Sequence, residues 1–310
     1  MNGVYIGLGI LLAVGVLVLG AAYLCFHLAF FVPRRHTSSD EIELPKGKIY
    51  EPYYDSMTVW ARQTREMPYE EMCITSFDGL RLYGKYYEYA SDAPIELMFH
   101  GYRSSAQRDL CGAVQRCREL GHSALIVDQR CSGRSEGRVI TFGVREHRDC
   151  LSWLAFMGER FGPEAKIILT GISMGAATVL MTADKPLPPT VIGILADCGY
   201  SSPRDIIRKV IRQLHLPVWL CYPLVRLGAR LYGGFDPEAD SPAQAVAHST
   251  RPILFFHGET DDFVPCEMSH TLYDACPAEK RLVTIPQAGH GLCYLMDTPG
   301  YMRAVREFFH

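Results

Sequence analysis

A serine flanked by glycines is the residue of this chain best placed for nucleophilic chemistry. The pentapeptide Gly171–Gly175 (GISMG) follows the apolar run Lys166–Thr170 and precedes the small and apolar stretch Ala176–Met181. A strand, a G-x-S-x-G turn and a helix form a nucleophile elbow, in which the serine hydroxyl stands clear of the sheet. A turn without chemistry would share this pattern, so the rest of the chain must supply a base, an acid and an oxyanion hole.

Histidine is suited to take the proton of Ser173, because the pKa of its imidazole lies near the operating pH. Of the 11 histidines, His290 lies in a glycine-flanked loop directly after the last predicted strand, Arg281–Ile285. It also follows the serine along the chain, as the order serine, acid, histidine requires. We therefore predict that His290 is the base.

Three carboxylates compete for the role of the acid, which holds the imidazole tautomer and stabilises the imidazolium. Asp261 comes four residues after His257 at the end of a predicted strand, Asp262 is its neighbour, and Asp197 ends the preceding strand. We favour Asp261 and interpret Asp262 as a capping or salt-bridge residue. Asp197 remains the alternative acid.

An oxyanion hole requires two preorganised hydrogen-bond donors. One prediction is the backbone N–H of Met174, which directly follows the nucleophile. The other is the backbone N–H of Tyr102, because His100-Gly101 permits a close approach of that loop. We interpret His100 itself as a structural residue.

The elements that must position these residues alternate along the chain. Strands alternating with helices of 10 to 15 residues indicate a mostly parallel sheet with helices on both faces, preceded by an antiparallel hairpin around Asp78-Gly79. The reactive residues then gather at the carboxyl ends of the strands. Strands are predicted at 71–77, 80–89, 95–99, 123–127, 166–170, 191–196, 252–256 and 281–285, and helices at 106–120, 145–161, 176–181, 202–215, 217–232, 266–276 and 301–310.

The predicted domain, 70–310, contains an insertion at 199–250 that exceeds a single crossover helix. We interpret it as a small helical cap over the site, with apolar surface from Trp219, Leu220 and Tyr222 among others. On this interpretation the choice of substrate depends on the cap. An ordinary pair of packing helices is the alternative.

Residues 3–32 contain no Asp, Glu, Lys or Arg, and are long enough to cross a bilayer as one helix. The run is too long and lacks the basic start of a signal peptide, so we predict a retained membrane anchor. Arg34 and Arg35 then place the following domain in the cytoplasm. Residues 33–69 are predicted as a linker followed by a short amphipathic helix at 53–66, which packs on the domain rather than on the membrane.

Composition narrows the class of protein further. The chain has 310 residues, a net charge of -3 and a pI near 6.4, so no basic field indicates a nucleic-acid partner. Its 11 cysteines are scattered without C-x-x-C pairs, and no H-E-x-x-H occurs. Neither a metal site, a disulfide framework nor an organic cofactor is indicated, and the cysteine usage favours a reducing compartment.

Taken together, these motifs resemble those of the α/β-hydrolase superfamily, and more narrowly the serine aminopeptidase S33-like and Bem46-like esterase and lipase group, some of whose members are membrane-anchored. The likeness covers about residues 70–308 and rests on HGY at 100–102, DQR at 128–130, GRSEG at 133–137, GISMG at 171–175, the segment 257–265 and Gly289-His290. It departs from the family pattern at Cys131, where a glycine is usual.

The resemblance implies Ser173 as nucleophile, Asp261 as acid and His290 as base, which is the assignment reached from the residues. The expected function is a membrane-anchored hydrolase of carboxylic esters or related acyl bonds, with a small acyl-ester or lipid-like substrate. Peptidase, thioesterase or acyltransferase chemistry on the same triad is an alternative. So is a non-catalytic binding protein, because fold alone does not fix function.

Overall fold

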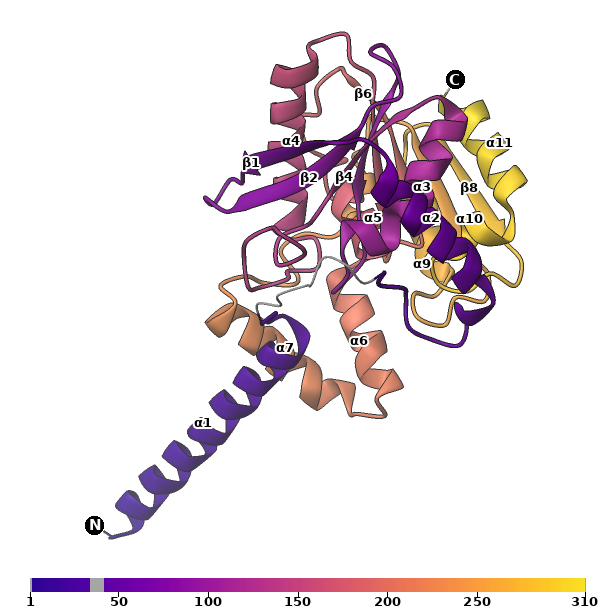
Figure 1. Cartoon of the computed structure of the whole chain (residues 1–310). Helices are drawn as coiled ribbons and strands as arrows, with labels where there is room; N and C mark the ends of the chain where they lie inside the picture. The colour runs from indigo at the N-terminus through magenta and orange to yellow at the C-terminus, as the bar shows by residue number, and fades with distance from the viewer. Residues whose placement is uncertain (1, 34–41, 310) are drawn as a thin grey trace.

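A central eight-stranded sheet organises the molecule in the computed structural model, which describes residues 2–33 and 42–309 (Figure 1). The strand order is β1-β2-β4-β3-β5-β6-β7-β8. β1 and β2 form the predicted antiparallel hairpin, β2 pairs antiparallel with β4, and all other pairs are parallel. The strands are β1 (Glu70–Thr75), β2 (Arg81–Tyr87), β3 (Ile95–Phe99), β4 (Ser123–Val127), β5 (Ile167–Ile172), β6 (Val191–Asp197), β7 (Ile253–Gly258) and β8 (Lys280–Ile285).

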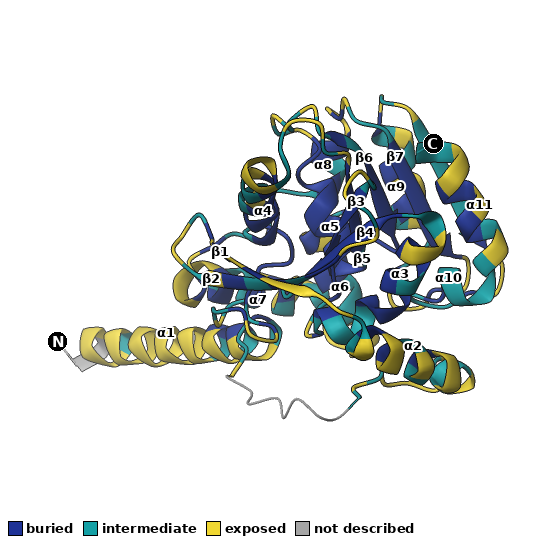
Figure 2. Cartoon of the chain, turned by 45° about the horizontal axis from the view of Figure 1, so that its top comes forward, coloured by how far each residue is buried: buried dark blue, intermediate teal, exposed yellow. Residues whose placement is uncertain are grey.

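Helices cover both faces of the sheet, which confirms the predicted fold class. One face packs against α4 (Glu146–Phe161), α5 (Met174–Leu180), α8 (Pro242–Val246) and α9 (Glu267–Ala275). The other packs against α3 (Ala106–Leu120), α10 (Cys293–Met296) and α11 (Thr298–Phe309). Because side chains alternate along a strand, β3 sends Leu97 to the first layer and Met98 to the second. Figure 2 shows the buried strands between helices whose outward faces are exposed.

Two short helices, α8 and α10, were not predicted from the sequence. They contain five and four residues, too few to show a helical period in the pattern of apolar residues. The last helix also begins three residues earlier than predicted. Asp297 accounts for this early start, because its carboxylate accepts a hydrogen bond from the Gly300 N–H at 3.0 Å.

The segment predicted as a cap, 199–250, contains α6 (Pro203–Gln213), α7 (Val218–Tyr232) and α8. Its apolar residues face in different directions. Tyr222 and Val225 are buried, but Trp219 is 78% exposed and Leu220 is 48% exposed in the first turn of α7.

The N-terminal helix α1 (Asn2–Ala29) projects from the domain and packs on α7 near its own C-terminus (Figure 1). Ala22, Phe26 and Phe30 are buried there. A side chain at Gly228 of α7 would place its Cβ 2.2 Å from the Ala22 carbonyl oxygen, so this glycine permits the close approach of the two helices. Arg34 and Arg35, on which the predicted orientation depends, lie outside the described residues.

The predicted amphipathic helix is α2 (Tyr54–Glu66), preceded by a 3-10 turn, η1 (Glu51–Tyr53). It packs on α3, as expected from its apolar face. The Trp60 ring lies so close to Gly112 that a Cβ there would come within 2.7 Å of it. On its other side, Trp60 packs against Tyr294 of α10, with ring centroids 5.5 Å apart.

Candidate active site

Ser173 lies at a sharp turn between β5 and α5. Its φ of 57° and ψ of −118° are strained for a residue other than glycine. The flanking glycines are required by contact: a Cβ on Gly175 would lie 2.0 Å from the Phe99 carbonyl oxygen, and one on Gly171 would lie 2.2 Å from the backbone of Gly175. The sequence context therefore folds as the nucleophile elbow that it predicts.

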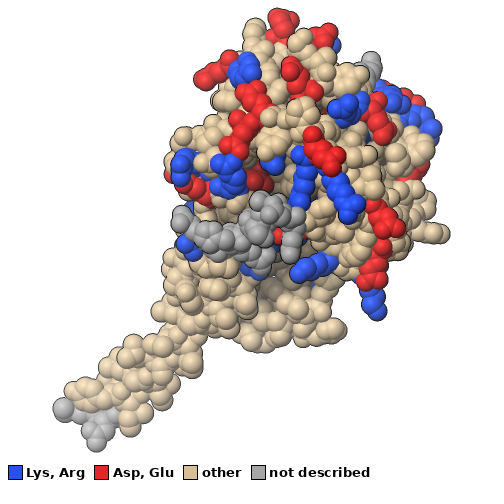
Figure 3. All heavy atoms as spheres, viewed as in Figure 1, with Lys and Arg blue, Asp and Glu red and all other residues tan. Residues whose placement is uncertain are grey.

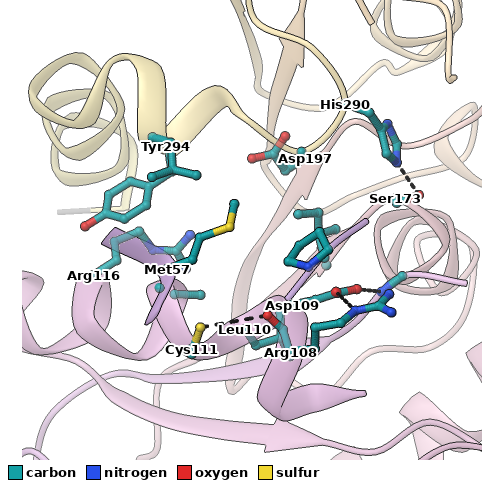
Figure 4. Close-up of a pocket in the computed structure, with 18 of the residues that line it drawn as sticks. Met57, Arg108, Asp109, Leu110, Cys111, Arg116, Ser173, Asp197, His290 and Tyr294 are labelled. Carbon is teal, nitrogen blue, oxygen red and sulfur yellow. Dashed lines mark hydrogen bonds and ion pairs between the residues drawn. The ribbon is translucent and has the colours of Figure 1, made fainter. Parts of the chain in front are cut away.

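His290, in the loop after β8, lies between Ser173 and Asp261. Its Nε2 is 2.9 Å from Ser173 Oγ (Figure 4). Its Nδ1 is 2.6 Å from Asp261 Oδ2. A carboxylate accepts the Nδ1 proton, which leaves Nε2 free to accept the proton of the serine hydroxyl. The structure thus brings the three residues together in one continuous chain of hydrogen bonds.

Asp261 is held rigidly at the end of β7. Its Oδ1 accepts hydrogen bonds from the backbone N–H groups of Phe263 (2.9 Å) and Val264 (2.8 Å). Burial raises the pKa of this carboxyl, but the hydrogen bonds from His257 and His290 outweigh that effect and hold the pKa below its usual value. The carboxylate is therefore ionised at neutral pH and is suited to stabilise an imidazolium.

The other two carboxylates considered as the acid are engaged elsewhere. Asp197 is buried at the end of β6 and accepts a hydrogen bond from the Tyr301 hydroxyl at 3.2 Å. The side chain of Asp262 is exposed, and its backbone carbonyl accepts hydrogen bonds from Lys209 and Gln213 of α6. Neither carboxylate is hydrogen-bonded to His290.

The predicted oxyanion donors are the N–H groups of Met174, which follows Ser173 in the chain, and of Tyr102 in the loop after β3. Within the described residues, neither amide donates a hydrogen bond to the protein. The loop after β3 approaches Ser173 closely, since a Cβ on Gly101 would lie 3.9 Å from Ser173 Oγ. Two unpaired N–H groups beside a nucleophile are the donor arrangement that a tetrahedral intermediate needs.

His100 has a structural environment, as predicted. Its Nδ1 lies 2.8 Å from the Gly101 carbonyl oxygen, and its Nε2 accepts the Gln129 N–H at 3.0 Å. Burial lowers its pKa, so the ring is neutral. Cys131, which replaces the usual glycine, takes the left-handed φ of 69° that a glycine would adopt without strain.

Cys198, Asp261 and His290 place potential metal-ligand atoms within 4.8 Å of one another. Two of these atoms belong to the histidine–carboxylate pair described above. Burial, together with the nearby Asp197 and Asp261 carboxylates, raises the pKa of the Cys198 thiol well above its usual value. Because metals bind the thiolate, this set of donors fits a hydrogen-bonded acid and base better than a metal site.

A cavity of about 230 Å³ begins at Ser173 and His290 and extends along the face of the sheet covered by α3 and α10 (Figure 4). None of the described residues that line it belongs to 199–250, so the segment predicted as a cap contributes no wall to this cavity. Its walls instead include Tyr50, Met57 and Trp60 from the segment before β1, and residues 108–113 of α3. The Tyr50 hydroxyl also donates a hydrogen bond to the His290 carbonyl oxygen at 3.0 Å.

Sequence reasoning did not identify Tyr50, Met57 and Trp60 as residues of the site. The helical spacing of Met57 and Trp60 was the available signal, but it indicates an apolar helix face without saying what that face encloses.

Comparison with known proteins relates this geometry to a family. A model described as the alpha/beta hydrolase family matches residues 97–305. The uncharacterized protein YqkD of Bacillus subtilis is 26% identical over 191 residues, which is 61% of this chain and 63% of that protein. Protein bem46 of Schizosaccharomyces pombe is 23% identical over 78% of this chain and 77% of its own length. The esterase Pf2001 of Pyrococcus furiosus superposes with a TM-score of 0.66 at 19% identity, covering 90% of this chain and 97% of that chain.

Proposed function

Because the chain belongs to the alpha/beta hydrolase family, we propose that it is a serine hydrolase that cleaves carboxylic esters or related acyl bonds. The hydrogen-bonded chain Asp261–His290–Ser173 carries this proposal. It pairs a nucleophile with a base and the base with an ionised carboxylate, beside two unpaired backbone donors. The esterase Pf2001, a structural neighbour, agrees with the proposed reaction class.

In the proposed reaction, Ser173 Oγ attacks the acyl carbonyl while His290 Nε2 takes its proton. The N–H groups of Met174 and Tyr102 hold the oxyanion of the tetrahedral intermediate. The bond to the alcohol then breaks, and His290 returns the proton to the leaving oxygen. A water molecule, deprotonated by the same imidazole, next attacks the acyl-enzyme and releases the acid. No step requires a metal or an organic cofactor.

We also propose that α1 anchors the enzyme in a membrane. The segment Val4–Ala29 has a mean hydropathy of 2.5 and is long enough to cross a bilayer, although a signal sequence would satisfy the same criteria of length and composition. Residues 4–19 are almost all exposed, whereas the end of the helix is packed on α7. Figure 3 shows a surface nearly free of charge around α1 and the adjoining cap, and charged side chains over the rest of that view. Packing of the helix on the domain favours a retained anchor over a cleaved signal.

The proposed organisation is an anchor at 3–32, a linker and helix at 33–69, and a hydrolase domain at 70–310 with the cap at 199–250. We place the domain in the cytoplasm on the basis of Arg34 and Arg35.

Labelling with a fluorophosphonate probe tests the proposed chemistry. The wild-type chain is expected to be labelled, and Ser173→Ala to lose labelling completely. Ser152→Ala, at a half-buried serine of α4, is the matched control and should be labelled like the wild type. Undiminished labelling of Ser173→Ala would refute the assignment of the nucleophile. An unlabelled wild type would favour a non-catalytic binding protein on the same fold.

A further inference from the structure

The cavity at Ser173 has a polar inner end. Asp197 of β6, Arg116 of α3 and Tyr301 of α11 all line it. Figure 4 shows Asp197 between the Ser173–His290 pair and the Arg116–Tyr294 end of the cavity. The walls between are mostly apolar or aromatic side chains, from Met57, Leu110, Ile172, Leu195, Tyr294 and Leu295 among others. A substrate group that reaches beyond these walls therefore meets buried polar atoms.

Those polar atoms belong to one hydrogen-bonded network. The Tyr301 hydroxyl donates to Asp197 Oδ2 at 3.2 Å and accepts from Arg116 Nη1 at 3.3 Å. Arg116 also pairs with Glu96 of β3 through a buried ion pair. Glu96 is fixed further by the Thr170 hydroxyl and by His122 Nδ1, each at 2.9 Å. The network is thus anchored in three strands and two helices and holds its members in place.

Two atoms of this network are left without a partner. Asp197 Oδ1 and Arg116 Nε are buried, and neither has a hydrogen-bond partner among the described residues. The exposed fraction is 6% for Asp197 and 3% for Arg116. Leaving a buried polar atom without a hydrogen bond is costly, so such atoms are rare in folded proteins. Here both open positions belong to residues that line the cavity leading from the nucleophile.

The Asp197 carboxyl also loses its proton less readily than an ordinary aspartate does. Burial raises the pKa of the Asp197 carboxyl, an effect that the nearby Cys293 thiol and Tyr301 hydroxyl only partly offset. The Arg116 guanidinium is already paired with Glu96. The inner end of the cavity therefore suits a neutral ligand group rather than a second full charge.

We propose that this cavity binds the acyl group of the substrate, and that Asp197 and Arg116 recognise an uncharged hydroxyl or amide at the far end of that group. Such a group accepts from Arg116 Nε and donates to Asp197 Oδ1, which completes the network. The acyl group is the part that stays bonded to Ser173 after the alcohol leaves, so an inward cavity suits it. This inference rests on the proposed serine hydrolase function.

The test compares matched pairs of compounds over a range of chain lengths. One set contains p-nitrophenyl esters with plain, ω-hydroxy and ω-carbamoyl acyl chains, and the other contains the corresponding alkyl fluorophosphonates. At the chain length that spans the cavity, the polar member is expected to react at least about tenfold faster, in kcat/KM or in labelling rate. Comparison of the ω-hydroxy with the ω-carbamoyl compounds shows which of the two groups the site prefers.

Variants at Asp197 connect the preference to this residue. Asp197→Leu is expected to reduce the polar-to-plain ratio to about one, whereas Asp197→Asn keeps a hydrogen-bonding group of the same shape and retains most of the ratio. Asp92→Leu, at an exposed aspartate just before β3, is the control. If Asp197→Leu does not fold, the polar-to-plain ratio measured for the wild type still tests the proposal.

Equal reaction of plain and polar members at every chain length in the wild type would overturn the proposal, as would an unchanged ratio in Asp197→Leu. The first result would mean that the cavity does not recognise a polar end of the acyl group, and the second that a residue other than Asp197 recognises it. Absence of labelling by every fluorophosphonate is a different outcome, because it contradicts the serine hydrolase function itself.

Discussion

Asp261 and Asp262 are neighbours in the chain but have entirely different surroundings. Asp261 is buried, accepts two backbone N–H groups and holds His290 Nδ1. Asp262 has an exposed side chain, and only its backbone carbonyl is engaged, by α6. At the scale of single residues, catalysis should therefore depend on the first carboxylate and not on the second.

We predict that Asp261→Asn lowers kcat by about 10³- to 10⁴-fold, because an amide in place of the carboxylate neither holds the imidazole in the required tautomer nor stabilises the imidazolium. Asp262→Asn should leave kcat within about threefold of the wild type. Ester hydrolysis by the two purified variants checks this. Similar losses in both would show that the acid has been assigned incorrectly.

The C-terminal end of α1 is hydrogen-bonded to the loop that carries the proposed oxyanion donor. The Tyr102 hydroxyl donates to the Ala29 carbonyl oxygen at 2.6 Å, and Arg103 Nη2 donates to those of Leu28 (2.8 Å) and Phe31 (3.1 Å). The last carbonyls of a helix have no partner within it, so these side chains cap α1. At the scale of elements, α1 and the loop that carries Tyr102 are thus held together.

Tyr102→Phe tests this coupling, because it removes the hydroxyl and keeps both the ring and the backbone N–H. Losing the hydrogen bond of this hydroxyl, worth about 1 kcal/mol, should position the backbone donor less well. We expect kcat to fall roughly threefold to tenfold with little change in KM, since an oxyanion donor acts in the transition state. Tyr89→Phe, at a tyrosine that is 54% exposed, is the control. Unaltered kcat in Tyr102→Phe would argue that α1 has no bearing on the oxyanion loop.

At the scale of the whole molecule, α1 consists of two parts with different roles. Residues 4–18 are almost entirely exposed. Near the end of the helix Phe26 is 5% exposed, and Phe30, which directly follows the helix, is fully buried against Phe142 and Phe235, with ring centroids 5.7 and 5.1 Å away. The second part belongs to the core of the domain, and the first is the part that we propose to lie in the membrane.

Two truncations separate these parts. A chain lacking residues 2–18 keeps a helix too short to span a bilayer, so it should lose binding to phosphatidylcholine vesicles and keep its melting temperature. A chain lacking residues 2–32 also loses the burial of both phenylalanines, about 3–6 kcal/mol, and should melt more than about 5 °C lower. Equal melting temperatures would show that the end of α1 is not part of the domain. Vesicle binding by the shorter truncation would contradict the anchor.

Much of this protein follows from local patterns in its sequence. The fold class, the eight strands and the nucleophile elbow were predictable, because apolar runs, glycines and turn residues act within a few positions of one another. Ser173, Asp261 and His290 were identified by the strand ends that they follow and by their order in the chain. Their geometry fits the predicted triad. Their catalytic roles are a proposal, for which the labelling and substitution experiments above are the tests.

Only the tertiary structure decided what surrounds the serine. Tyr50 lies 240 positions from His290, and Asp197 lies 104 positions from Tyr301, yet each pair is hydrogen-bonded. Contacts at such separations leave no period or motif in the sequence, because they depend on how helices pack on the sheet rather than on local propensity. For this reason the sequence suggested a cap at 199–250 but not the cavity at Ser173, which is lined by residues of α2, α3 and α10 among others and extends past Asp197 to Arg116.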